Sequence, residues 1–132
     1  MIHEVTCAII QKDDKILICQ RSKQMKLPLK WEFPGGKVEP SESYEDCLLR
    51  EIFEELAIRV SVLRRLTVVE HHYAGFSIRL HPFVCQYEDG ELLAAEHAQT
   101  VWVPKEKLMD YDWAEADIPV VRELIVATDA YW

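Results

Sequence analysis

The sequence predicts an α/β (α+β) fold, an α/β/α sandwich in which a mixed β-sheet lies between helices. Short runs of β-branched and apolar residues alternate with polar turns along most of the chain, and two segments have the periodicity of amphipathic helices. The 132 residues have an even composition without repeats or linkers, so we expect a single domain over residues 1–132.

The N-terminal residues predict a β-hairpin. Ile2–Ile10 is rich in β-branched residues, Lys15–Gln20 is apolar, and the polar Gln11–Lys15 between them contains Asp13 and Asp14, which favour a turn. The next expected segments are a basic loop at Ser22–Lys30 and a short apolar piece at Trp31–Phe33, which Pro34-Gly35-Gly36 breaks.

A helix is predicted from about Tyr44 to about Leu56. Ser43 is a good N-cap, and Asp46 is a weak capping-box partner three residues later. The elements expected after this helix are strands at Arg59–His72 and Phe76–Tyr87 separated by a turn near Ala74-Gly75, a turn at Asp89-Gly90, a short strand at Thr100–Val103, a helical turn at Lys105–Met109 and an amphipathic helix at Ile118–Thr128.

Composition and charge exclude several classes of protein. The net charge of −8 opposes binding to a nucleic acid polymer, because neutralising its phosphates needs Lys and Arg. No stretch approaches the ~18–20 apolar residues of a membrane span, and the N-terminus lacks a secretory signal. We therefore expect a cytoplasmic protein without membrane contact, either a monomer or a homodimer. The cysteines lack C-x-x-C spacing, so we expect buried free thiols at Cys7, Cys19, Cys47 and Cys85.

Three glutamates stand out in the predicted helix. Glu51, Glu54 and Glu55 are at positions i, i+3 and i+4, so they project from one face, and Arg50 borders that face. On the opposite face, which we expect to pack on the sheet, are Leu48, Leu49, Ile52 and Leu56. Taken alone, the acidic face also fits an ordinary solvated surface.

The Gly35-Gly36 pair before this helix points to a metal site. Glycines permit close backbone approach, and we expect a loop that leaves their carbonyl oxygens exposed. Carboxylate and carbonyl oxygens are ligands that Mg²⁺ and Mn²⁺ prefer, and Mg²⁺ commonly binds few carboxylates together with substrate phosphates. An acidic cleft filled by cations would therefore bind a polyanion despite the negative net charge.

The segment from Gly36 onward resembles the Nudix box, in which a Gly and a Glu at fixed spacing precede Arg-Glu-apolar-x-Glu-Glu-x-Gly-apolar. The positions in register are Gly36, Glu42, Arg50, Glu51, Ile52, Glu54, Glu55 and Ile58. Ala57 departs from the pattern, because the family has a second Gly there, where a left-handed backbone is common after a helix. We expect Ala57 to cost roughly 1 kcal/mol of stability without loss of chemistry.

Segments outside the box are similar to the MutT-like branch of the family. These are Ala8–Ile10, Ile16–Arg21, Trp31–Pro34, Glu96–Trp102 and Ala116–Pro119. The resemblance implies a Nudix-type sandwich and a hydrolase that uses Mg²⁺, for which Mn²⁺ can substitute.

The resemblance also implies roles for the charged residues. The metal ligands would be Gly36 through its carbonyl, Glu51, Glu54, Glu55 and, outside the box, Glu96, which as a bare residue also fits a solvated charge. Arg50 would orient a catalytic Glu by ion pairing, and Glu42 would brace the loop and the helix or contact a metal. The carboxylate that takes the proton of the attacking water is left open between Glu51, Glu54 and Glu96.

Five further residues are candidates for binding substrate. Arg21 matches the family at the end of its strand and, like Lys37, is a candidate phosphate contact, although Lys37 fits a solvated charge equally well. Phe76 and Ile78 alternate along one face of a strand and would form the wall of a base pocket or ordinary core. Asp117 aligns with the branch's base-reading position, where it would accept a hydrogen bond from an amino group, and it fits an N-cap of the last helix equally well.

By resemblance, we expect hydrolysis of (deoxy)nucleoside triphosphates to a monophosphate and pyrophosphate. Oxidised or modified substrates such as 8-oxo-dGTP or (d)CTP derivatives would make this a reaction of nucleotide-pool sanitation. The alternatives are dinucleoside polyphosphates or nucleotide sugars as substrates, or a non-catalytic nucleotide-sensing module. Tyr73 stands where the ADP-ribose branch often has a Pro, which weighs against ADP-ribose. The intact acidic cluster weighs against a module that only binds.

Overall fold

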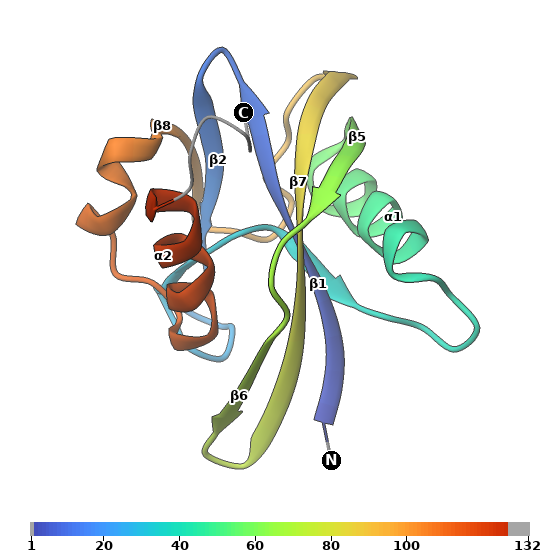
Figure 1. The fold of residues 1–132 in the computed structure, drawn as a ribbon, viewed down its shortest axis with the longest axis vertical. Coiled ribbons are helices and arrows are strands. Elements are labelled where there is room, and N and C mark those ends of the chain that lie inside the picture. The colour runs from blue at the N-terminus through green and yellow to red at the C-terminus, as the bar shows by residue number, and fades with distance from the viewer. Residues whose placement is uncertain (1, 127–132) are drawn as a thin grey trace.

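The computed structural model describes residues 2–126 as a mixed β-sheet of eight strands with helices on both faces (Figure 1). The strands are β1 (Ile2–Lys12), β2 (Lys15–Gln20), β3 (Trp31–Glu32), β4 (Gly35–Lys37), β5 (Ile58–Arg65), β6 (Val69–Tyr73), β7 (Phe76–Gly90) and β8 (Gln99–Pro104). The order along the sheet is β3-β2-β1-β7-β5, while β4 pairs with β1, β6 with β7 and β8 with β2. Strands β1 and β7 are parallel and the other pairs are antiparallel, so the predicted mixed sheet is confirmed.

Within the described residues, two α-helices and two 3-10 helices cover the sheet. Helix α1 (Tyr44–Leu56) lies on one face, and α2 (Ile118–Val126) lies on the other with η1 (Lys105–Asp110) and η2 (Glu115–Asp117) (Figure 1). The α/β/α sandwich expected from the sequence is therefore confirmed. The last helix begins at Ile118 as predicted, but its expected end at Thr128 lies outside the described residues.

The ends of α1 follow from local chemistry. The Ser43 hydroxyl accepts a hydrogen bond from the Asp46 backbone N–H at 3.1 Å, as an N-cap does. Ala57 ends the helix in a left-handed conformation, with φ 59° and ψ 26°. Both predicted boundaries are thus confirmed, and Ala57 has the backbone geometry that a glycine adopts at lower cost.

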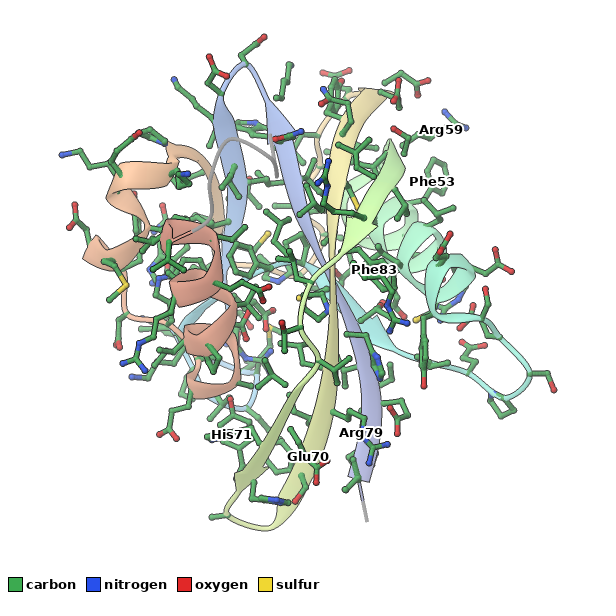
Figure 2. All side chains as sticks on the ribbon, in the orientation of Figure 1. Phe53, Arg59, Glu70, His71, Arg79 and Phe83 are labelled. Carbon is green, nitrogen blue, oxygen red and sulfur yellow. The ribbon has the colours of Figure 1, made fainter. Side chains whose placement is uncertain are left out.

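The sheet separates two apolar cores, because alternate residues of a strand point to opposite faces. In β1, Cys7 and Ile9 join the core beneath α2, while Ala8 and Ile10 join the core beneath α1. Phe83 of β7 is 1% exposed and belongs to the α1 core (Figure 2). The four cysteines are buried and free, as expected.

Three predicted details of the elements are wrong. The turn at Asp89-Gly90 is instead the end of β7, where Gly90 pairs with Ile58 at a φ of 108°. The single strand expected at Arg59–His72 is divided into β5 and β6, both paired with β7, because the chain turns Leu66 into the core between them. Leu49, expected on the buried face of α1, is 39% exposed, and its place facing the sheet is taken by Cys47.

The prediction of a loop at Gly35-Gly36 is also wrong, because these residues form β4 and pair with Thr6 and Cys7 of β1. Among residues 2–126, no helix has the length and apolar character that crossing a membrane requires.

Candidate active site

A cavity of about 340 Å³ gathers predicted site residues that are far apart in the sequence. Its lining residues come from β4, the loop of residues 22–30 and the β6–β7 hairpin, among other segments. This hairpin projects from the sheet (Figure 1). The candidates among its lining residues are Arg21, Gly36, Lys37, Glu55, Phe76, Ile78 and Asp117. Strand pairing brings them together, because β1 pairs with both β4 and β7 and so lies between Gly36 and Ile78.

Aromatic rings form one wall of the cavity. Phe76 stacks on Tyr73 with ring centroids 5.0 Å apart, and the Lys26 ammonium lies 4.6 Å from the centre of the Phe76 ring. The Tyr73 hydroxyl accepts a hydrogen bond from the Ala116 N–H at 2.8 Å, which fixes the hairpin against η2. His71 of the same strand lies 3.0 Å from a Glu115 carboxylate oxygen and holds the hairpin to η2 a second time (Figure 2). A flat aromatic surface that is held in this way suits a nucleobase.

Asp117 lines the cavity and is buried, with 6% of its surface exposed. Its Oδ2 accepts a hydrogen bond from the Phe33 backbone N–H at 2.9 Å, so the carboxyl group is directed to the sheet rather than to the first turn of α2. This position corrects the N-cap interpretation. Burial, and next the charge of Glu32, raise the pKa of Asp117 to about 8.

Glu32 lies beside Asp117 and was not among the predicted site residues. Arg21 Nη1 donates a hydrogen bond to Glu32 Oε1 at 2.7 Å, and Arg21 Nε donates to the Lys26 carbonyl at 2.5 Å. The second oxygen, Glu32 Oε2, lies 2.9 Å from Nε2 of His97. A phosphate would therefore compete with Glu32 for Arg21. In this structure Arg21 lines the cavity as the ion-pair partner of Glu32.

Glu55 forms the acidic end of the cavity. Burial, followed by the charges of Glu51, Glu32 and Glu96, raises the pKa of Glu55 to about 8. Its Oε2 is buried and has no hydrogen-bond partner within residues 2–126. The acidic face expected to point away from the core is thus directed partly into it. Glu96 itself is exposed, but its charge contributes to the raised pKa of Glu55.

Arg50 connects the carboxylates of the box. Its guanidinium holds Glu42 with two bonds, from Nε at 2.7 Å and from Nη2 at 2.9 Å, which lower the pKa of Glu42 to about 2. Its Nη1 donates to Glu51 at 2.8 Å and to Glu54 at 3.0 Å. Glu42 also accepts a bond from the Glu39 backbone N–H, so it braces the loop to the helix. Burial raises the pKa of Glu51, and Arg50 opposes that rise.

Gly36 leaves room for the side chain of Glu51. A Cβ atom at Gly36 would collide with Glu51 Cδ, at a separation closer than real Cβ contacts come. The Gly36 carbonyl accepts bonds from the Thr6 hydroxyl at 3.3 Å and the Cys47 thiol at 3.6 Å, so it is less open than the sequence suggested.

The residues at the acidic end fit a divalent cation by their chemistry. Within residues 2–126, no three His, Cys, Asp or Glu side chains are already gathered as a metal site. The unpaired buried oxygen of Glu55 nevertheless needs a positive partner, and Glu51 and Glu96 add carboxylates whose charges act on it. Glu54 shares the acidic side of α1, where its side chain is 54% exposed and bonded to Arg50.

Comparison with known proteins agrees with this geometry. A family model described as NUDIX domain matches residues 1–124. The CTP pyrophosphohydrolase of Escherichia coli (strain K12) is 42% identical over 119 residues, which cover 90% of this chain and 88% of that protein. The putative 8-oxo-dGTP diphosphatase 2 of Mycobacterium tuberculosis (strain ATCC 25618 / H37Rv) is 32% identical over 126 residues, covering 94% of this chain and 89% of that protein. The solution structure of the E. coli ORF135 protein matches with a TM-score of 0.83 and 39% identity over 98% of this chain and 92% of that chain.

Proposed function

The chain belongs to the NUDIX domain family, and on that premise we propose that it is a Mg²⁺-dependent pyrophosphohydrolase of nucleoside triphosphates. The products would be a nucleoside monophosphate and pyrophosphate. The names of the relatives favour cytidine triphosphates and 8-oxo-dGTP as substrates, which fits a role in removing damaged or surplus nucleotides. A cytoplasmic location and a monomeric or homodimeric state stay predictions.

One observation carries the proposal: a single cavity joins an aromatic wall to a carboxylate, that of Glu55, with one buried oxygen that lacks a hydrogen-bond partner among the described residues. Phe76 and Ile78 offer a surface for a base, and Asp117 offers a buried polar group. Glu55 and Lys37 line the same cavity, and Glu55 connects it to the helix that would meet the phosphates. A nucleotide that stacks on Phe76 would thus place its phosphates beside the glutamates of α1.

The cation site would be formed by Glu51, Glu54, Glu55, Glu96 and the Gly36 carbonyl. When bound there, Mg²⁺ supplies positive charge against the phosphate oxygens and makes a water molecule more acidic. Arg50 keeps Glu51 and Glu54 in place by its bonds of 2.8 and 3.0 Å, and so orients them. One carboxylate among Glu51, Glu54 and Glu96 takes the proton of the attacking water. Lys37 lines the cavity, which supports its proposed contact with a phosphate.

The test combines activity with a measurement that does not need turnover. We expect the purified protein to release pyrophosphate and CMP from CTP in Mg²⁺, and to do the corresponding reaction with dCTP or 8-oxo-dGTP. Product analysis separates this from cleavage of dinucleoside polyphosphates or nucleotide sugars. Titration with Mn²⁺, followed by electron paramagnetic resonance without nucleotide, should show binding that Glu55→Gln weakens. Intact triphosphates after long incubation, together with no bound Mn²⁺, would refute the proposal.

A further inference from the structure

His97 is a buried histidine with one partner, and that partner is an acid of the cavity. Its side chain is 2% exposed, and its Nε2 lies 2.9 Å from Glu32 Oε2. Its other ring nitrogen, Nδ1, is buried and has no hydrogen-bond partner among the described residues. A ring that donates from Nε2 leaves only a lone pair on Nδ1, whereas a proton on Nδ1 would be a buried donor without an acceptor. The geometry therefore selects the tautomer that donates to Glu32.

Strand register explains how His97 reaches Glu32 although it does not line the cavity. Gln20 of β2 pairs with Trp31 of β3 on one side and with Gln99 of β8 on the other. The Ala98 N–H donates to the Gln20 carbonyl at 2.9 Å, which extends this pairing to the residue next to His97. His97 consequently lies across β2 from Glu32.

The hydrogen bonds to Glu32 hold its side chain in place but leave its carboxylate able to accept further hydrogen bonds. Each of its carboxylate oxygens has one protein partner, Arg21 for Oε1 and His97 for Oε2, and each oxygen has a second lone pair. The Glu32 side chain is 18% exposed and lines the cavity beside Phe76 and Asp117. A carboxylate held there presents hydrogen-bond acceptors. They suit the exocyclic amino group of a base, which donates, and they repel a carbonyl oxygen, which only accepts.

We propose that His97 is a positioning residue that holds Glu32 toward the cavity, so that the site favours nucleobases with an exocyclic amino group, such as cytosine, over those with a carbonyl there, such as uracil. The inference deepens the proposed function and rests on it. His97 is not among the residues that line the cavity, so it would act through Glu32 rather than by contact with the nucleotide. Loss of His97 frees Glu32 to rotate, which removes the discrimination between the two bases.

The test compares CTP with UTP, which differ where cytosine has an amino group and uracil a carbonyl. We expect the wild type to have the higher kcat/KM with CTP, and His97→Leu to lower the CTP-to-UTP ratio roughly tenfold, as for a lost hydrogen bond to a charged group. Most of the change should be in KM. His97→Gln, whose amide nitrogen reaches a position near that of Nε2, should restore most of the ratio. Glu32→Gln, which offers a donor as well as an acceptor, should lower the ratio at least as far.

His81 provides the matched control. It is also buried, at 4% exposure, and its Nε2 lies 2.7 Å from a Glu4 oxygen, but it is not part of the cavity lining. His81→Leu should lower the melting temperature and leave the CTP-to-UTP ratio unchanged. If His97→Leu lowers kcat/KM equally for CTP and UTP, or if the wild type does not prefer CTP, the inference is wrong.

Binding of the monophosphates separates the two proposals. Calorimetric titration of CMP and UMP into the wild type, Glu32→Gln and His97→Gln proteins measures base preference without turnover. Preference for CMP that Glu32→Gln abolishes would support the inference even if no triphosphate is hydrolysed, in which case only the proposed function fails. Equal binding of CMP and UMP by the wild type would overturn the inference while hydrolysis still tests the function.

Discussion

Replacing Glu55 by Gln should make the metal-free protein more stable at alkaline pH. The pKa of Glu55 is raised from 4.5 to about 8, first by burial and then by neighbouring carboxylates. Between these two pH values the folded protein keeps a proton that the unfolded chain has released. The free energy of unfolding must therefore fall as pH rises, by up to about 1.4 kcal/mol per pH unit. Over the whole window this amounts to about 3–5 kcal/mol for Glu55.

The amide introduced by Glu55→Gln has no proton to lose, so the variant should lack this part of the pH dependence. We expect the two proteins to have similar free energies of unfolding at pH 5, and the variant to be more stable by about 3–5 kcal/mol at pH 8. The measurement is urea denaturation in EDTA at several pH values. Contributions from other groups, such as Asp117, cancel in the difference. Glu45→Gln, in the exposed first turn of α1, is a control for the substitution itself and should follow the wild type.

Mg²⁺ provides the second half of the test, because it would compete with the proton on Glu55. Its stabilising effect on the wild type should grow from pH 6 to pH 8 and should be largely absent in Glu55→Gln. If the free energy of unfolding of the variant falls with pH as steeply as that of the wild type, the raised pKa of Glu55 is not the source of the pH dependence. A variant less stable than the wild type at pH 8 would show the same.

Three further outcomes follow from single residues. Ala57→Gly should raise the free energy of unfolding by roughly 1 kcal/mol in urea denaturation, because Ala57, with a φ of 59°, is in a left-handed conformation that costs alanine more than glycine. An unchanged free energy of unfolding would show that Ala57 is not strained. Glu54→Gln should lower kcat by ~10²–10⁴ at saturating Mg²⁺, and near-normal turnover would remove Glu54 from the reaction. Asp117→Asn keeps an acceptor for the Phe33 N–H, so it should change the ranking of nucleotides in kcat/KM with little change in melting temperature; the opposite pattern would assign it a structural role.

Local signals in the sequence were sufficient for α1 and its acids. Ser43 and Ala57 mark the ends of the helix because their effects depend on the adjacent backbone alone. The spacing of Glu51, Glu54 and Glu55 fixes which side of the helix they share. Leu49 was placed wrongly because helical periodicity gives the direction of the buried face only to within one residue. That uncertainty also concealed how far Glu55 is turned inward.

Glu32 and His97 could not be found in the same way. The two residues are far apart in the chain, and they meet only because β3 and β8 both pair with β2. Glu32 stands in a short apolar piece of sequence, where it resembles an ordinary edge residue. Its presence beside Phe33 and Asp117 depends on the register of several strands, which alternating hydrophobicity does not specify. An acid between Trp31 and Phe33 was the available signal, because a charge within an apolar strand needs a partner.

The charges in the cavity support the proposed need for a cation. Glu32, Glu55 and Asp117 all line it, and the Arg21 guanidinium is already bonded to Glu32. Lys26 and Lys37 alone would not balance a triphosphate in the presence of these acids. Because like charges at close range raise each other's free energy, an acidic cavity holds a polyanion only if positive charge enters with it. Burial and, after it, the neighbouring carboxylates raise the pKa of Glu55 in the metal-free protein. A divalent ion bound beside Glu55 would offset both effects, so the cost in stability and the proposed capacity for metal binding would have one physical origin.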